Sequence, residues 1–352
     1  MDIAVKFGFL SDQPILTQDG SINLESGQGS VAGRLLDMYP GARLIAPKLA
    51  RGNGFEVVTL SSIDANSTIV VNLDVLDSVC VFQRLHRSGA EPKIVNFQWV
   101  NPTVFNHPVN FGAMGLSYAF FPTFCAGERT AGEVREVLER WAPPEYVHRA
   151  RIAWADLGVG ISREMDHAEG GEPVVLYPAI TMDARKQPGQ FMKIVTAAHK
   201  RAPFKVVARL AQSHLVTDQA MDLAHLEWAN VGPLRSDRDD YWNELAHTTA
   251  FLATSREEAY GLAYVEALLA GVIGIFPDLP WARRLLPDGY PFLYSDRGQA
   301  EDMLVRAVTD PAGCRAQLDQ LAGGSFVQWV RLNHDRRDFE DVFTAQLREW
   351  FS

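Results

Sequence analysis

The feature that most constrains the fold is an alternation of short apolar runs with helical patterns. In the first half of the chain the runs that read as strands cover residues 3–10, 43–46, 55–60, 68–73, 93–99 and 118–121. Helical spacing is found between them, at residues 31–38, 76–85 and 131–141. Strands that alternate with helices favour a parallel sheet covered on both faces. The sequence therefore predicts an α/β fold.

The same alternation starts again after residues 162–173, which are polar and rich in glycine. Later strands are expected at residues 174–177, 204–210, 226–231, 250–253 and 272–276, and helices at 189–201, 239–247, 263–270 and 326–351. A chain of 352 residues is long enough for two domains. We expect two Rossmann-like doubly wound domains that face a cleft, with the first spanning residues 1–165 and the second residues 170–335.

Composition excludes several classes of protein. Lys and Arg number 33 and Asp and Glu 43, so the net charge of −10 counts against nonspecific binding to phosphate backbones but leaves room for a local basic groove. Cys80, Cys125 and Cys314 are too few and too far apart for a disulfide framework or a zinc ribbon. The first residues lack a signal-peptide pattern, and the longest apolar run, 267–276, is too short to cross a membrane. We expect a cytoplasmic protein without a membrane span.

Residues 251–277 carry the strongest chemical signal. They read as a buried strand, a loop, a helix closed by glycine and a second strand, and in an open α/β sheet such a loop binds ligands. Gly261 permits a tight turn, after which the amides of Leu262 and Ala263 point out of the helix N-terminus, where phosphate is favoured. Glu266 stands among apolar neighbours, so its carboxylate needs a donor partner, and a pair of ribose hydroxyls would serve.

Glu258 and Glu266, with Gly261 between them and a Glu-Ala-x-x-x-Gly run that begins at Glu266, resemble the E-x7-E motif of retaining nucleotide-sugar glycosyltransferases of the family-four type. The resemblance implies that Glu258 contacts the donor sugar, that Glu266 holds the ribose, and that Tyr260 belongs to the same donor site. The alternative is that Glu258 is a solvated loop carboxylate and Glu266 a carboxylate on a helix surface.

The resemblance further implies the GT-B fold, with the donor on the second domain and the acceptor on the first. It also implies that a final helix, residues 336–352, crosses back to the first domain. In this family an Arg and a Lys in the first loop of the second domain neutralise the donor diphosphate, and Lys186 fits the Lys. Thr181 stands where the Arg is usual, so Arg185 is the candidate to replace it. A pair of surface cations is the alternative.

Two further donor contacts are implied at turns. Gly29 and Ser30, at the start of the first helix, resemble the family's Gly-rich loop, although a plain turn is an equal interpretation. Leu234 belongs to a turn, residues 231–235, that resembles the turn under the nucleobase.

Candidate acceptor contacts follow a first-domain strand. The family often has a His there that touches the sugar, and this chain has Gln98 and Trp99 instead, with His107 soon after. Trp99 offers a stacking surface for a sugar or base, or packs in the core. His107 either replaces the family His or is polar surface.

No metal or cofactor is expected. Asp237 and Asp239 form a D-x-D, but Ser236 and Asp239 are better explained as a capping box for the helix that follows. The nine histidines show no metal-ligand spacing. Cationic side chains and helix amides would then carry the charge of the leaving diphosphate.

These observations predict a retaining hexosyl- or pentosyltransferase that moves a sugar from a nucleotide sugar to a hydroxyl of a small molecule or glycan. Residues 241–294 also resemble tRNA-queuosine mannosyltransferases and, more loosely, phage DNA glucosyltransferases, so a modified base in DNA or tRNA is an alternative acceptor. A second alternative is a noncatalytic GT-B protein that binds nucleotide sugars. A Rossmann dehydrogenase is disfavoured because no glycine fingerprint follows the first strand.

Overall fold

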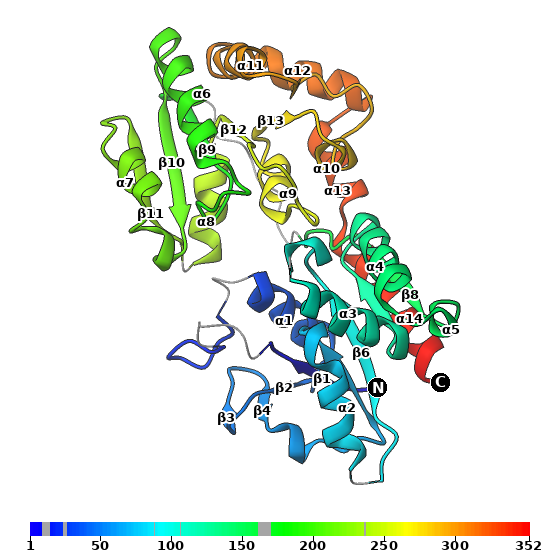
Figure 1. Cartoon of the computed structure of the whole chain (residues 1–352). Coiled ribbons are helices and arrows are strands. Elements are labelled where there is room, and N and C mark those ends of the chain that lie inside the picture. Colours follow the sequence, from blue (N-terminus) through cyan, green and yellow to red (C-terminus); the bar gives the residue numbers. More distant parts are fainter. Residues whose placement is uncertain (9–14, 24–26, 88, 106, 161–169, 236) are drawn as a thin grey trace. The chain divides into compact units, whose positions relative to one another are not determined.

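A computed structural model describes residues 1–8, 15–23, 27–87, 89–105, 107–160, 170–235 and 237–352 (Figure 1). It divides into two compact units. Unit 1 comprises Met1–Leu157 and Arg337–Ser352, and unit 2 comprises Gly158–Arg336. Unit 1 therefore ends before the predicted residue 165, and the last helix is part of it. Most of the polar segment 162–173 lies outside the described residues.

Unit 1 is built on one sheet with the order β3-β4-β2-β1-β5-β6-β7-β8. Its strands are β1 (Asp2–Lys6), β2 (Arg43–Ile45), β3 (Ala50–Arg51), β4 (Glu56–Val58), β5 (Thr68–Asn72), β6 (Lys93–Gln98), β7 (Thr123–Cys125) and β8 (Ile152–Trp154). All pairs are parallel except β3 with β4. The strand order reverses between β1 and β5, which is where a doubly wound sheet opens a crevice at its carboxyl edge.

The helices of unit 1 pack on this sheet. They are α1 (Gly27–Met38), η1 (Leu60–Ser62), η2 (Val75–Asp77), α2 (Ser78–His86), η3 (Pro102–Val104), α3 (Pro108–Phe120), α4 (Glu128–Trp141), α5 (Pro144–Val147) and α14 (Arg336–Phe351). Helix α14 buries Phe339 and Phe343 against the sheet, where the Phe343 ring lies 5.5 Å from Phe97 and 4.8 Å from Phe124. This aromatic contact is why the end of the chain belongs to unit 1.

One expected element of unit 1 is wrong. Residues 118–121 were predicted to be a strand, but they form the end of α3 and the residue that caps it. The apolar run before them has no β-branched residue after Val109, and Pro108 begins the helix behind the cap residue His107. The strand that continues the sheet is β7, at Thr123–Cys125.

Unit 2 has a parallel sheet with the order β11-β10-β9-β12-β13-β14. Its strands are β9 (Val174–Tyr177), β10 (Lys205–Leu210), β11 (Ala229–Pro233), β12 (Ala250–Leu252), β13 (Ile273–Pro277) and β14 (Leu293–Tyr294). Its helices are α6 (Pro188–Arg201), η4 (Gln212–His214), α7 (Asp218–Ala224), α8 (Arg238–Ala246), α9 (Leu262–Leu269), α10 (Pro280–Arg284), α11 (Arg297–Thr309), α12 (Pro311–Ala322) and α13 (Phe326–Asn333).

The strand order of unit 2 reverses between β9 and β12, which are paired. The loop after β9 and the loop after β12 therefore leave the sheet side by side at its carboxyl edge. These loops carry Lys186 and Glu258, so the topology brings together two residues that lie far apart in the sequence. Within the described ranges, no helix is both long enough and apolar enough to span a membrane.

Candidate functional site

The site in unit 2 is built around an ion pair that joins its two loops. The Nζ atom of Lys186 contacts Oε1 of Glu258, with one residue from the β9–α6 loop and the other from the β12–α9 loop. The side chains are 21 % and 13 % exposed, respectively. Both can therefore be reached from solvent, yet they are shielded enough for their charges to matter more than those of a surface pair.

Tyr264, in the first turn of α9, fixes the position of Glu258. Its hydroxyl donates to Glu258 Oε1 over 3.0 Å and lies 2.9 Å from the Ser255 hydroxyl. Burial, together with the negative charge of Glu258, raises the pKa of Tyr264 well above its ordinary value. The phenol therefore stays protonated and serves as a permanent donor to the carboxylate.

The two loops are also joined through the backbone. The Thr254 hydroxyl donates to the Lys186 carbonyl over 2.7 Å, and the Arg256 amide donates to the Arg185 carbonyl over 3.0 Å. Gln187, which precedes α6, has a φ of 52°, and in the described residues it alone among non-glycines has a positive φ. Such a conformation persists only where the surroundings enforce it, and it is frequent at ligand sites.

Arg185 is placed differently from Lys186. Its side chain is 51 % exposed, and its Nη2 lies 3.4 Å from Oδ2 of Asp183 in the same loop. Asp183 also accepts from the Thr181 hydroxyl at 2.9 Å. Burial would raise the pKa of Asp183, but Thr181 and Arg185 lower it overall. The loop therefore carries an ionised aspartate, which offsets part of the positive charge of Arg185.

Helix α9 begins as the sequence predicted. Gly261 has a φ of 88°, and a Cβ atom there would lie 2.7 Å from the Tyr264 ring, so glycine is required. Leu262 and Ala263 form the first turn, where backbone amides have no intrahelical partner. Tyr260, expected in the donor site, is instead buried, and its hydroxyl lies 2.7 Å from His334 Nδ1. Its side chain is part of the packing of unit 2.

Glu266 lies inside α9 with two donors on its carboxylate. The Arg238 guanidinium contacts Oε1 at 2.5 Å, and the Tyr241 hydroxyl donates to Oε2 over 2.8 Å. Tyr241 is partly buried, and the desolvation of its hydroxyl raises its pKa well above the ordinary value, whereas Arg238 is 59 % exposed. The Glu266 carboxylate is therefore oriented by Tyr241 and paired with an arginine that is largely exposed.

The α8 region contains the D-x-D pair. Asp237 accepts from the Asp239 amide at 2.6 Å and caps the helix, whereas Ser236, the residue predicted to cap it, lies outside the described residues. Leu234 is partly buried just before this cap. The neighbouring Arg235 is held by Glu244 over 2.8 Å.

In unit 1, Gln98 and Trp99 are engaged in packing. Gln98 is 1 % exposed, accepts from the Tyr118 hydroxyl at 2.8 Å and donates to the Val100 carbonyl at 2.5 Å. The Trp99 indole donates to the Leu73 carbonyl over 3.2 Å, and its ring lies against Gly27. Both side chains serve the internal structure of unit 1, so neither presents a free polar group to a ligand.

The other predicted residues of unit 1 belong to helix starts. Gly29 and Ser30 lie in the first turn of α1 rather than in a loop before it. His107 is exposed and caps α3, where its Nδ1 accepts from the Val109 amide at 3.2 Å. The structure therefore does not bring Gln98, Trp99 and His107 together into one set of ligand contacts.

Sequence reasoning missed the residues that hold the two glutamates, Tyr264, Tyr241 and Arg238, and also Thr254, which joins the two loops. The spacing of Tyr264 from Glu258 was a usable signal, because residues in a first helical turn lie close to the preceding loop. Tyr241 and Arg238 come from another helix, so no local pattern could place them. Among the described residues, no group of three or more His, Cys, Asp or Glu side chains is arranged to hold a metal ion.

Comparisons with known proteins show the fold. No protein-family model and no curated protein sequence matches the chain. Sucrose-phosphate synthase from Thermosynechococcus elongatus has a similar structure, with a TM-score of 0.71, 12 % identity and 99 % of each chain covered. A UDP-forming α,α-trehalose-phosphate synthase from Burkholderia xenovorans gives a TM-score of 0.69, 11 % identity and 99 % of each chain.

A third similar structure is TarM of S. aureus, with a TM-score of 0.59 and 12 % identity over 81 % of this chain and 56 % of TarM. All three are glycosyltransferases with the GT-B fold. The prediction of that fold is confirmed. At these identities the comparisons establish architecture, and the roles of individual residues rest on the geometry described above.

Proposed function

We propose that this protein is a glycosyltransferase that moves a sugar from a nucleotide sugar to an acceptor hydroxyl with retention of anomeric configuration. The observation that carries the proposal is the Lys186–Glu258 pair, held across the two loops at the switch point of unit 2. The GT-B fold supports it, because the neighbours with this fold include a UDP-forming enzyme and a sucrose-phosphate synthase.

The donor would bind at the carboxyl edge of unit 2. Glu258, oriented by Tyr264, would accept hydrogen bonds from hydroxyls of the donor sugar. Glu266 would accept from the ribose hydroxyls, with Tyr241 holding the carboxylate in place. The sequence places these glutamates on either side of the N-terminus of α9, so the phosphates would lie near the amides of Leu262 and Ala263.

The leaving diphosphate needs positive charge, and Lys186 is the first source of it. In the structure Lys186 is paired with Glu258, so an arriving phosphate would share the ammonium group with that carboxylate. Arg185 is exposed and is the second candidate. We propose that these cations and the helix amides suffice without a metal ion, in which case donor turnover will be unchanged by EDTA.

Thermal unfolding with UDP, GDP, ADP and CDP in turn tests the donor site. A ligand at 100 times its Kd stabilises the folded state by about 2.7 kcal/mol, which raises Tm by a few degrees. We expect one nucleotide to give such a shift and Glu266→Ala to abolish it. Glu301→Ala is the matched control, since Glu301 is a similarly shielded glutamate paired with an arginine in α11. The absence of a shift with every nucleotide would refute the donor site.

Turnover separates an enzyme from a noncatalytic binder. Slow hydrolysis of the nucleotide sugar is expected for the wild type, and Glu258→Ala should reduce its rate by at least 100-fold while the nucleotide still raises Tm. Hydrolysis that persists unchanged in Glu258→Ala would remove this residue from the mechanism. Nucleotide binding without any hydrolysis or transfer would support the noncatalytic alternative instead.

For the acceptor we propose a hydroxyl of a small molecule or glycan, bound by unit 1. The alternative of a modified base in DNA or tRNA gains no support from the fold or from the comparisons. Trp99, which the sequence offered as a stacking surface for a base, is bonded to Leu73 and packed on Gly27. We also propose that the protein acts in the cytoplasm, on the evidence of its composition alone.

A further inference from the structure

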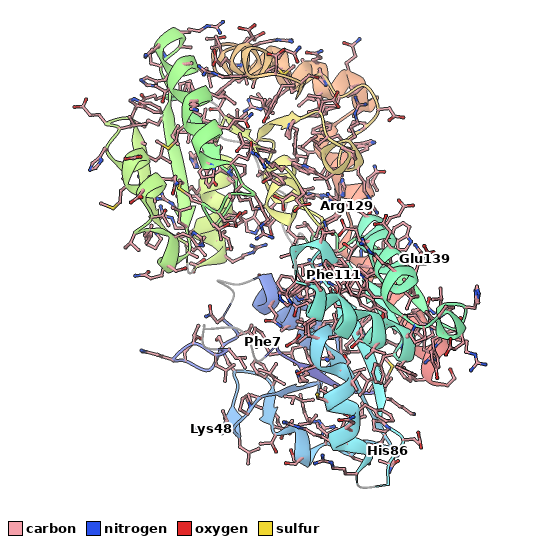
Figure 2. The ribbon with its side chains drawn as sticks, in the orientation of Figure 1. Phe7, Lys48, His86, Phe111, Arg129 and Glu139 are labelled. Carbon is pink, nitrogen blue, oxygen red and sulfur yellow. The ribbon has the colours of Figure 1, made fainter. Side chains whose placement is uncertain are left out.

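A lysine with no solvent exposure lies at the end of the central strand of unit 1. Lys6, the last residue of β1, is 0 % exposed, and its Nζ contacts Asp77 Oδ2 at 2.7 Å and the Phe7 carbonyl at 3.3 Å. Figure 2 labels Phe7, where the chain leaves β1. A buried ammonium group is costly to retain and is kept only with a charged partner. This one lies at the switch point of the sheet.

A chain of buried hydrogen bonds fixes the partner of Lys6. Asn72, at the end of β5, donates to Asp77 Oδ1 at 2.9 Å and to the Ser78 hydroxyl at 2.8 Å. Ser78 in turn donates to Asn96 Oδ1 at 2.6 Å. The network runs from β1 across β5 to β6, so Asp77 is held from both sides and its charge is matched by Lys6.

Asp74 lies at the carboxyl edge of the unit 1 sheet, and its carboxylate is not part of this network. It follows β5, it is partly buried, and its Oδ1 accepts from the Leu76 amide at 3.3 Å. No other described residue donates to its side chain. The side chains of Asp74 and Gln28 both point toward Gly8, which has no side chain of its own. A Cβ atom built on Gly8 would lie 3.4 Å from Asp74 Oδ2 and 2.7 Å from Gln28 Nε2.

The geometry points to Asp74 as the residue of unit 1 that binds the hydroxyl of the sugar acceptor, with Gln28 beside it and the Lys6–Asp77 pair as its positioning element. This inference rests on the proposed function. The charges of Lys6 and Asp77 offset each other, so Asp74 gives this end of the unit 1 sheet a net negative charge. A carboxylate accepts hydrogen bonds from hydroxyls and repels phosphate, so the acceptor class is a neutral polyhydroxyl compound.

The surroundings of Asp74 also favour this role. Burial, followed by the negative charge of Asp77, raises the pKa of Asp74, while Lys6 lowers it in part. The side chain of α1 that faces it, Gln28, carries no charge. A hydroxyl that donates to the charged form stabilises that form, so the pKa of Asp74 falls when the acceptor binds.

The test is a ¹³C NMR titration of the full chain labelled at the aspartate carboxyl carbons. The Asp74 resonance is assigned by its loss in Asp74→Asn, and D-glucose is added without nucleotide. We expect a saturable shift of this resonance and a lower Asp74 pKa. D-glucose 6-phosphate should bind at least tenfold more weakly. The resonance of Asp64, an exposed aspartate of the same unit bonded to Ser67, is the control that should not move.

Asp77→Asn tests the positioning pair. It frees the Lys6 ammonium group to pair with Asp74, so the pKa of Asp74 should fall before glucose is added and the affinity for glucose should drop severalfold. Loss of the Asp77 charge lowers this pKa by itself, so the affinity for glucose is the deciding measurement, and a merely structural Asp77 would leave that affinity unchanged. Lys6→Met, if it folds, should raise that pKa.

The inference is overturned if D-glucose gives no saturable shift at Asp74, or if only the phosphorylated sugar does. Its failure is separable from failure of the proposed function. If a nucleotide stabilises the protein through Glu266 while Asp74 is inert, only the acceptor residue is wrong. If no nucleotide binds, the donor site is wrong, whatever the titration shows.

Discussion

Individual residues show how unit 2 retains carboxylates close to its surface. Glu258, Glu266 and Glu244 are each partly buried, and each carboxylate is held by at least one cation and by a second donor. Tyrosines supply the fixed donors to the first two, because burial keeps their phenols protonated. Glu244 differs, since it is held by two arginines, Arg209 and Arg235. It is therefore the clearest case of a carboxylate that serves stability.

Glu244 gives a prediction for acid pH. Burial would raise its pKa, but Arg209 and Arg235 hold it below the ordinary 4.5. A depressed pKa contributes stability that is present above the unfolded value and is lost as the pH falls through the folded value. Glu244→Gln should cost about 2 kcal/mol at pH 7.

The difference between Glu244→Gln and the wild type should shrink as the pH drops below 4.5, the ordinary pKa of the carboxyl group. Urea unfolding of both proteins across the acid range measures it. A difference that stays constant with pH would show that the ionised form of Glu244 has no special role.

Elements show why the site forms where it does. Each of the two loops of the unit 2 site follows a strand at the point where the sheet order reverses, and each is followed by a helix that carries apolar residues back to the core. Helix α9 begins at a glycine with a positive φ, and α6 begins after Gln187, which has one as well. A residue with a left-handed backbone directly precedes each helix, and hydrogen bonds between the two loops hold Lys186 close to Glu258.

Gly261→Ala tests the start of α9. The change places a Cβ 2.7 Å from the Tyr264 ring in a left-handed backbone conformation, which costs about 1–2 kcal/mol for the backbone alone. Because Tyr264 orients Glu258, nucleotide-sugar turnover should also fall. Gly132→Ala is the control, since Gly132 lies in α4 with nothing within 4 Å of a Cβ, and it should be neutral or stabilising by up to about 1 kcal/mol. Thermal unfolding and donor hydrolysis measure both variants.

The whole molecule consists of two units with separate cores. The last helix completes the first unit by placing Phe339 and Phe343 on Phe97 and Phe124. The proposed nucleotide site lies entirely within unit 2. We therefore expect a change in the aromatic cluster to lower the stability of unit 1 and to leave nucleotide binding by unit 2 intact.

Phe343→Ala should destabilise unit 1 by about 3–5 kcal/mol, because a fully buried ring is removed from an aromatic cluster. In scanning calorimetry we expect this variant to lower the unfolding temperature of unit 1. The unfolding temperature of unit 2, which a bound nucleotide raises, should stay unchanged. Phe120→Ala is the control, since that ring is 50 % exposed. Movement of the nucleotide-sensitive transition by Phe343→Ala would show that the two units unfold as one.

The sequence by itself determined those features of the fold and the site that depend only on residues close together along the chain. Apolar periodicity predicted most strands, but it missed α10, α11 and α12 and joined α13 and α14 into one helix. The run from residue 251 to residue 277 predicted the strand, turn and helix that carry both glutamates, because these elements are local in sequence. The expected strand at residues 118–121 failed because an uncharged, apolar helix and a buried strand look alike in sequence. The division into units agreed in outline, but residue 157, not 165, ends the first unit.

Only the tertiary structure decided which polar side chains have hydrogen-bond or ion-pair partners inside the protein. Gln98 and Trp99 looked like ligand contacts, yet each is bonded inside unit 1, because buried polar groups must find partners that the fold supplies. Lys6 and Asp77 lie far apart in the sequence, and the parallel pairing of β1 with β5 brings them together. Such ion pairs depend on which strands are neighbours in the sheet, and the spacing of residues along the chain does not predict that order.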